Sequence, residues 1–193
     1  MKTWPVVPTI LVIAAVATMI ALGVWQLQRK GEKEALLARY AAATGLPPVT
    51  WPAVPDPGNL PLFRKSSLMC IKVTEWQAVS GTNIAGDAGF AHVASCQTGG
   101  MEGPGAKVAI GWSPRPETPE WQGGAVSGTI APDKPQLIKL VSSDAAPGLQ
   151  KLAAPSPEQI PNNHFLYAIQ WFIFASAAAI IYVLAVRRRQ QTD

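Results

Sequence analysis

The stretch VVPTILVIAAVATMIALGVW, residues 6–25, contains twenty residues and no charged side chain. A second uncharged stretch of twenty-two residues, FLYAIQWFIFASAAAIIYVLAV, covers residues 165–186. An α-helix rises about 1.5 Å per residue and the hydrocarbon core of a bilayer is roughly 30 Å thick, so about twenty apolar residues cross it once. The sequence therefore predicts a membrane protein with an N-terminal and a C-terminal transmembrane helix.

The first apolar stretch has one competing interpretation, a cleaved signal peptide. Lys2 gives it a basic start, but the stretch is longer than the roughly 7–15 apolar residues of a signal peptide. The residues that follow it, Gln26 to Arg29, offer no small-x-small cleavage site. We therefore interpret the stretch as an uncleaved anchor.

Charges beside the two stretches predict the orientation. Arg187, Arg188 and Arg189 follow the second stretch and favour a cytoplasmic C-terminus, which for two spans places the N-terminus there too. Basic residues after the first stretch argue against this, but long loops cross the membrane largely regardless of charge. We expect the central domain to be periplasmic, or in the intermembrane space of an organelle.

Composition narrows the functional class. The chain carries a net charge of +4, yet residues 45–161 contain eight Lys/Arg against nine Asp/Glu, so the surplus positive charge lies beside the membrane. This distribution does not resemble a basic face for nucleic acid. We recognise no serine–histidine pair, carboxylate cluster or phosphate loop, and expect the protein not to be an enzyme.

The sequence divides into five predicted parts. They are a first transmembrane helix (1–28), a helical extension with a proline-rich linker (29–61), a β-rich domain (62–161), a second transmembrane helix (162–187) and a cytoplasmic tail (188–193). Within the domain, short apolar runs separated by turn residues predict strands at 69–73, with an extension to 79, and at 90–96, 107–112, 125–130 and 136–141. Ser80 and Gly81 are expected to break the first. These strands predict a small antiparallel sheet or barrel.

The two cysteines, Cys70 and Cys96, leave three interpretations open. In an oxidising compartment such a pair often closes a structural disulfide. Two buried thiols that pack as small apolar groups are an alternative. The third is a copper site with Met69, His92 and Met101 as neighbouring soft ligands, although no CxxC or CxxxC spacing supports it.

The two histidines differ in their surroundings. His92 lies within a predicted strand, where most histidines are packed and hydrogen-bonded. His164 follows Asn163, a favoured N-cap residue, and opens the second transmembrane helix. A histidine in a membrane span is costly and suggests function, although one at the headgroup layer can serve only as an anchor.

Aromatic residues share a helix face with His164. Tyr167, Ala168 and Trp171 follow it at i+3, i+4 and i+7, which places a small residue between two aromatic rings. On the first helix, Trp25 and Arg29 also share a face.

Gln26 lies beside Trp25, and the first helix leaves the membrane where the second enters it. The two clusters are therefore expected at the same depth. Imidazole can ligate iron, aromatic faces can cover a macrocycle and guanidinium can pair with a propionate, so the set suits a flat amphiphile with an anionic edge.

Two motifs carry a resemblance to a known family. Residues 23–29, GVWQLQR, resemble the GxWQxxR signature of the Surfeit-locus-1 family of cytochrome c oxidase assembly factors. Residues 161–172, PNNHFLYAIQWF, resemble its second signature. Between them, Gly89-Phe90 and the segments 108–114 and 123–130 match the family's strands more loosely, with Ile110 where the family usually has arginine.

The resemblance implies an assembly factor for aa3-type cytochrome c oxidase that binds haem a and assists its insertion into subunit I. It implies a periplasmic domain, and without an Arg- and Ser-rich presequence we expect a bacterial inner membrane. Oxidase subunit I and haem a synthase are the expected partners. The hypothesis assigns six residues to the haem site: His164 as axial ligand, Arg29 as propionate partner, Trp25, Tyr167 and Trp171 as the wall over the ring, and Gln26 beside them. Gln26 is also expected to form a hydrogen bond with Gln170 between the helices.

Two rival hypotheses remain. One is a scaffold that holds oxidase subunits and binds no cofactor. The other is a thiol oxidoreductase or copper chaperone that uses Cys70 and Cys96.

Overall fold

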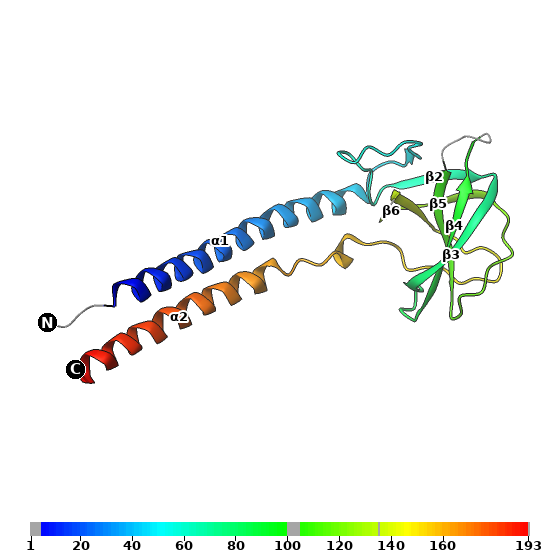
Figure 1. The fold of residues 1–193 in the computed structure, drawn as a ribbon. Helices are drawn as coiled ribbons and strands as arrows, with labels where there is room; N and C mark the ends of the chain where they lie inside the picture. The colour runs from blue at the N-terminus through cyan, green and yellow to red at the C-terminus, as the bar shows by residue number, and fades with distance from the viewer. Residues whose placement is uncertain (1–4, 100–104, 135, 193) are drawn as a thin grey trace. The chain divides into compact units, whose positions relative to one another are not determined.

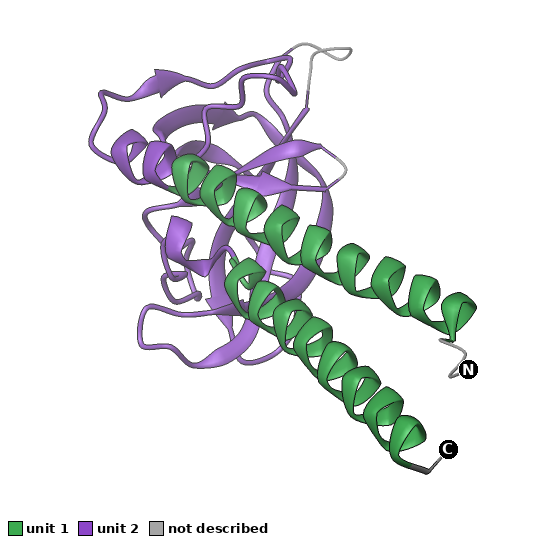
Figure 2. Cartoon of the chain, turned by 90° about the vertical axis from the view of Figure 1, so that its left-hand side faces the viewer, with its two compact units in different colours: residues 1–37, 161–193 green, residues 38–160 purple. Residues whose placement is uncertain are grey.

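A computed structural model describes residues 5–99, 105–134 and 136–192 of the chain (Figure 1). Two compact units make up the chain (Figure 2). The first contains residues 1–37 and 161–193, and the second contains residues 38–160. The first unit holds the C-terminal helix and most of the N-terminal helix, and the second holds a β-sheet, as the apolar stretches and the strand pattern predict.

Both predicted apolar helices are present and extend beyond the apolar stretches. Helix α1, Val6–Ala43, has 38 residues, and α2, His164–Thr192, has 29. At about 1.5 Å per residue they measure roughly 57 and 43 Å, more than the hydrocarbon core requires. Both are long and apolar enough to cross a membrane, which indicates a membrane protein. The predicted helical extension after Trp25 is confirmed, because α1 continues through Gly31 without interruption.

The helices pair through a regular stripe of residues, and Figure 1 shows them side by side. Partly or fully buried positions alternate at spacings of three and four, namely Thr9, Val12, Val16, Met19, Gly23 and Gln26 on α1, and His164, Ala168, Trp171, Ala175, Ala178 and Tyr182 on α2. This spacing is that of helices packed side by side at a shallow angle. Thr9 hydrogen-bonds Tyr182 at one end and Gln26 hydrogen-bonds His164 at the other, so the pair is antiparallel.

The second unit is a seven-stranded sheet in the order β1-β2-β6-β7-β5-β4-β3. Its strands are β1 Val49–Thr50, β2 Lys65–Cys70, β3 Lys72–Thr82, β4 Ala88–Gln97, β5 Gly105–Ser113, β6 Gly124–Asp133 and β7 Leu137–Ser142. The predicted antiparallel pairing is present in four strand pairs, β2–β6, β3–β4, β4–β5 and β6–β7, but the sheet is mixed, because β1–β2 and β5–β7 are parallel pairs. The sequence could not reveal this, since parallel pairing of β5 with β7 depends on β6 folding back between other strands.

One continuous segment supplies two strands that lie far apart in this sheet order, β2 next to one end and β3 at the other. β2 and β3 are separated only by Ile71, yet β2 pairs with β6 and β3 with β4. The Ile71 N–H donates to the Gln97 carbonyl at 2.9 Å, which helps to close the sheet towards a barrel. The predicted strand 69–73 is therefore split.

Gly81 was wrongly expected to end a strand, since it lies inside β3. A Cβ atom there would come within 2.9 Å of the Ala91 Cβ on β4. The glycine allows close strand approach instead of a turn.

The main core of the sheet domain is apolar and holds both cysteines. Its buried members are Leu62, Phe63, Cys70, Ala94, Cys96, Val108, Ile110, Val126, Ile130, Ile138 and Leu140. The proline-rich segment, which the sequence set apart as a linker, packs Val49, Trp51 and Leu60 against this core. The linker thus adds to the domain's apolar packing, although its prolines exclude long regular structure.

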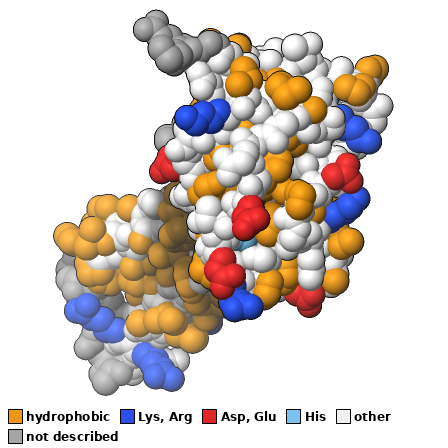
Figure 3. Space-filling model, turned by 90° about the vertical axis from the view of Figure 1, so that its right-hand side faces the viewer, with side chains coloured by type: hydrophobic (Ala, Val, Ile, Leu, Met, Phe, Trp, Pro, Cys, Tyr) orange, Lys and Arg blue, Asp and Glu red, His pale blue; other side chains and the backbone are white. Residues whose placement is uncertain are grey.

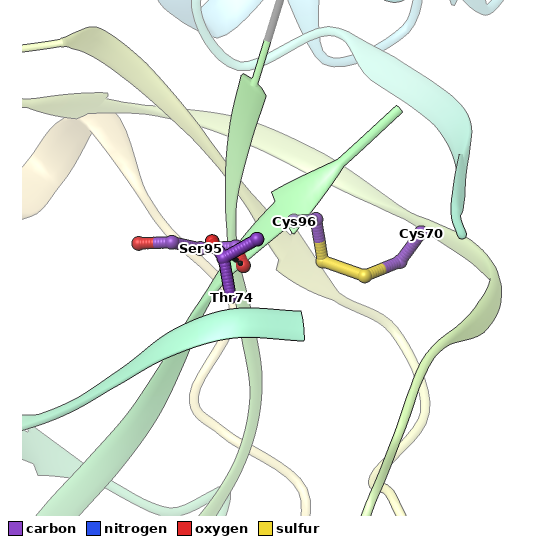
Figure 4. The surroundings of a disulfide bond; sticks show 4 residues. All are labelled: Cys70, Thr74, Ser95 and Cys96. Atoms are coloured by element: carbon purple, nitrogen blue, oxygen red, sulfur yellow. Dashed lines mark hydrogen bonds between the residues drawn. A yellow bond between two sulfur atoms is a disulfide. The ribbon is translucent and has the colours of Figure 1, made fainter. Parts of the chain in front are cut away.

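A disulfide joins Cys70 at the end of β2 to Cys96 on β4, as Figure 4 shows. β2 and β4 are not neighbours in the sheet order, so the bond links distant parts of the sheet. Both residues are buried. Of the three interpretations of the cysteines, the structural disulfide is confirmed.

Two of the loosely matching segments meet inside the sheet. A Cβ on Gly89 of β4 would lie 2.5 Å from the Trp112 ring of β5, so only glycine leaves room for that ring. The Trp112 indole N–H donates to the Gly81 carbonyl at 3.2 Å. The Gly-aromatic and Gly-Trp segments therefore serve packing of the domain.

Replacing both cysteines with alanine is expected to destabilise the sheet domain by about 3 kcal/mol, because the bond closes a loop with a sequence separation of 26. The measurement is thermal unfolding of the full chain in detergent, followed by tryptophan fluorescence. Met69→Ala, at an exposed neighbouring position, serves as the control. An unchanged unfolding midpoint in the double variant would contradict a stabilising role for the bond.

Candidate functional site

The two sequence motifs meet through a hydrogen bond between Gln26 and His164. The His164 Nδ1 atom lies 2.7 Å from the Gln26 Oε1 atom, and both side chains are partly buried. α2 begins at His164, directly after Asn163, whose carbonyl accepts from the Tyr167 N–H at 3.2 Å. The structure thus places the imidazole at the first helical position, against the motif of the other helix.

Small residues let the helices approach each other next to this contact. Gly23 is the buried residue of α1, and a Cβ there would lie 2.6 Å from the Phe172 Cε1 atom. On α2, Ala168 and Ala175 are buried. Because Gly23 and Gln26 are three residues apart, they share the face of α1 that contacts α2.

Trp25 and Arg29 form a second, more exposed group. The guanidinium carbon of Arg29 lies 5.7 Å from the centre of the Trp25 ring, within cation–π range. Arg29 also pairs with Glu32 at 2.6 Å, with both side chains more than half exposed. The predicted sharing of one face by Trp25 and Arg29 is therefore present.

The two aromatic residues that follow His164 take different positions. Tyr167 is 52 % exposed, and no ring contact joins it to another residue in the described part of the chain. Trp171 is partly buried and packs edge-on against Phe174, with ring centres 6.3 Å apart. The structure therefore puts Trp171 in the helix-pairing stripe and Tyr167 outside it.

The predicted hydrogen bond between Gln26 and Gln170 is wrong. Gln26 bonds His164 instead, and Gln170 is exposed. Gln170 lies between Ala168 and Trp171, which face α1, and its own side chain therefore points to another side of α2. Counting spacings of three and four along both helices would have shown this.

Lys30 and Phe165 are neighbours of the site that the sequence analysis missed. The Lys30 Nζ atom lies 5.9 Å from the centre of the Phe165 ring and 2.7 Å from a Glu34 carboxylate oxygen. Lys30 is one turn after Gln26, and Phe165 directly follows His164. The sequence could have indicated both residues, because each lies within one helical turn of Gln26 or His164.

His92 is a packed and hydrogen-bonded core residue, as expected. It is 1 % exposed, and its Nε2 atom lies 2.7 Å from the Ser113 Oγ atom. The Ser113 hydroxyl donates to the Arg115 carbonyl, so the imidazole is the donor to Ser113. Burial lowers the pKa of His92, opposed by a hydrogen bond with the Arg115 backbone, which favours a neutral ring at pH 7.

The copper site receives no support from the geometry. The sulfurs of Cys70 and Cys96 bond each other, and Met69 is exposed. Met101 lies outside the described residues. No group of three or more His, Cys, Asp or Glu side chains that could hold a metal occurs among the residues that the structure describes.

The sheet domain also contains a cavity of about 360 Å³. Small apolar side chains from several strands line it, including Ala91, Ala109 and Ala131, with Lys139 as its charged residue. None of the predicted site residues lines it. On the face of the domain shown in Figure 3, acidic and basic side chains are interspersed, in line with the near-neutral composition of the domain.

Comparison with known proteins assigns the family. The family model of the SURF1 family matches residues 13–176, which is most of the chain and includes both motifs. The chain belongs to the SURF1 family. No curated protein matches it in a sequence comparison. SURF1 proteins are known as cytochrome oxidase assembly factors, so the function of this chain lies in assembling that oxidase.

Gly23→Ala is expected to push the helices of this SURF1 protein apart next to the site, because the new methyl group would overlap the Phe172 ring. Overpacking of this kind typically costs about 1–3 kcal/mol. Nitroxide labels at the exposed positions Leu27 and Leu166 would report a longer or broader distance distribution by electron paramagnetic resonance.

Gly31→Ala is the matched control, since nothing lies within 4 Å of a Cβ built on Gly31 of the same helix. It should leave the label distance unchanged. Equal distance distributions for the two alanine variants would show that Gly23 does not set the helix separation.

Proposed function

We propose that this SURF1 protein binds haem a with His164 as its axial ligand and assists insertion of the haem into subunit I of an aa3-type cytochrome c oxidase. Haem a synthase is the proposed donor of the haem. The observation that supports the proposal best is the contact of the two family motifs, with the His164 Nδ1 atom 2.7 Å from the Gln26 Oε1 atom. An imidazole held at a defined position by a neighbouring helix suits ligation of iron.

The hydrogen bonding of His164 fits a ligand role. Metal-binding histidines bind through one ring nitrogen and hydrogen-bond the protein through the other. His164 has one nitrogen bonded to Gln26, and among the described residues no hydrogen bond involves the other. The ring therefore keeps one nitrogen for an iron atom.

Exposed aromatic and basic groups near His164 fit the rest of the haem. Trp25 is 46 % exposed and Tyr167 is 52 % exposed, so both rings have free surface for a macrocycle. Trp171 is partly buried and would contact the macrocycle only with the edge of its ring. Arg29 would bind a propionate by exchanging its exposed pair with Glu32, a kind of ion pair worth only about 0–1 kcal/mol.

The proposed location is a bacterial inner membrane, with both termini cytoplasmic and the sheet domain in the periplasm. Arg187, Arg188 and Arg189 at the end of α2 support this orientation. The end of α1's apolar stretch and the start of α2 then lie at the periplasmic headgroup layer. Haem a would bind at this outer interface, where its propionates remain hydrated and its ring contacts lipid and protein.

A single histidine ligand suits a transfer protein. A carrier must release its haem, and one axial ligand at a partly exposed site gives up iron more easily than a closed site with two histidines. The rival scaffold hypothesis requires no cofactor and makes no use of the free nitrogen of His164. The thiol or copper chaperone hypothesis requires free thiols, whereas Cys70 and Cys96 form a buried disulfide.

His164→Ala is expected to lose most of the bound haem a, because the replacement removes the iron ligand. The protein would be purified from cells that make haem a, and its absorption spectrum compared with that of the unmodified chain. Gln170→Ala is the control, since Gln170 is exposed on the same helix.

Equal haem content in His164→Ala and the unmodified chain would remove the ligand assignment. An unmodified chain that copurifies with subunit I but never carries haem would favour the scaffold.

A further inference from the structure

We infer that Gln26 is a positioning residue that fixes the tautomer of His164, so that the Nε2 atom is the one presented to the haem iron. This inference rests on the proposed function, which gives the tautomer a consequence. It also changes the role of Gln26, which the sequence analysis grouped with the residues that touch the haem. In the structure Gln26 lies behind the ligand.

The polarity of the hydrogen bond determines the tautomer. The Gln26 atom that faces the ring is Oε1, 2.7 Å from the His164 Nδ1 atom. An amide oxygen only accepts hydrogen bonds, so Nδ1 carries the proton. A neutral imidazole has one ring proton, and Nε2 therefore has a free lone pair.

The lone pair on Nε2 is what iron requires. Neutral imidazole binds metals through its unprotonated nitrogen, and the hydrogen bond at the other nitrogen decides which one that is. Such a hydrogen bond also fixes the ring orientation and raises the basicity of the ligating nitrogen. No hydrogen bond occupies His164 Nε2 in the part of the chain that the structure describes.

Packing one turn away holds Gln26 in place. Gly23 lies three residues before it on the same face and contacts the Phe172 ring of α2. On the other helix, α2, Ala168 lies one turn after His164 and is also buried. Gln26 can therefore move away from His164 only by changing its rotamer or by separating the helices.

The residues of the motif GVWQLQR thus lie on two sides of α1. Gly23 and Gln26 face α2, where one allows close approach and the other orients the imidazole. Trp25 and Arg29 form the exposed cation–π pair next to them. This arrangement explains why a glutamine, and not another aromatic or basic residue, occupies position 26.

The test is nitrogen NMR of the ring of His164 in the haem-free, full-length protein in lipid nanodiscs. The chain has two histidines, so His92→Gln in every sample leaves His164 as the single source of signal. We expect the Nδ1–H tautomer with Gln26. Gln26→Leu removes the acceptor and should shift the ring to the other tautomer or to a mixture.

Two further variants separate positioning from general damage. Gln26→Glu keeps an acceptor at the same place and should retain the Nδ1–H tautomer. Gln28→Leu makes the same chemical change at an exposed position of α1 and should have no effect. An unchanged tautomer in Gln26→Leu, or the Nε2–H tautomer in the presence of Gln26, would overturn the inference.

Haem titration of the same variants connects the tautomer with binding. Loss of a hydrogen bond behind a metal ligand typically weakens binding about 10–100-fold, which is the effect expected for Gln26→Leu with haem a, whereas Gln26→Glu should bind as the unmodified chain does. Haem affinity that is equal in Gln26→Leu and Gln28→Leu would overturn the inference. A chain with the Nδ1–H tautomer that binds no haem a would instead overturn the proposed function and leave the positioning by Gln26 intact.

Discussion

The close approach of two helices at Gly23 is the constraint on which the candidate site depends. Gly23 has no Cβ, and the Phe172 ring occupies the space where one would be. One turn further along α1, Gln26 reaches His164 with a hydrogen bond of 2.7 Å. A polar contact between helices is worth only about 0.6–2 kcal/mol in a membrane, so apolar packing has to hold the helices together while the polar contact adds geometry. The glycine supplies proximity and the glutamine supplies orientation.

The sheet domain is short, and a covalent bond and additional apolar packing contribute to its stability. Its strands surround a core of modest size, and the Cys70–Cys96 disulfide links β2 to β4 across the sheet order. The proline-rich segment adds Trp51 and Leu60 to the same core. His92 lies within this domain, buried and hydrogen-bonded to Ser113. The two histidines of the chain thus lie in different surroundings, since His92 is buried in the sheet domain and His164 is partly buried between the two helices.

The sequence predicted the helices well and their mutual contacts poorly. Twenty uncharged residues have few alternatives to a membrane helix, so α1 and α2 were evident from composition alone. Which side chains meet depends on the angle between helices, and Gln170 was assigned to the wrong face for that reason. Steps of four and three residues from His164 lead to Ala168 and Trp171 and pass over Gln170, which was visible in the sequence, whereas the pairing of Gln26 with His164 required the structure.

Strand pairing was less predictable, because it depends on contacts between residues far apart in the chain. Alternation gave the approximate positions of β4 to β7, but not the parallel pairing of β5 with β7. Gly81 shows the same limit, since a glycine in a strand can mark a turn or a close approach, and only the neighbouring Ala91 decides between them. The disulfide remained one of three options until the two cysteines were located in space.

The candidate site exists only if positions 26 and 164 lie close together in the membrane. Gln26→Cys combined with His164→Cys, treated with a short bifunctional thiol reagent in native membranes, should give the two peptides joined within one chain, as detected by mass spectrometry. The native cysteines are bonded to each other and do not react. Gln28→Cys with His164→Cys should link far less. Equal linking of the two pairs, or none in either, would contradict the account.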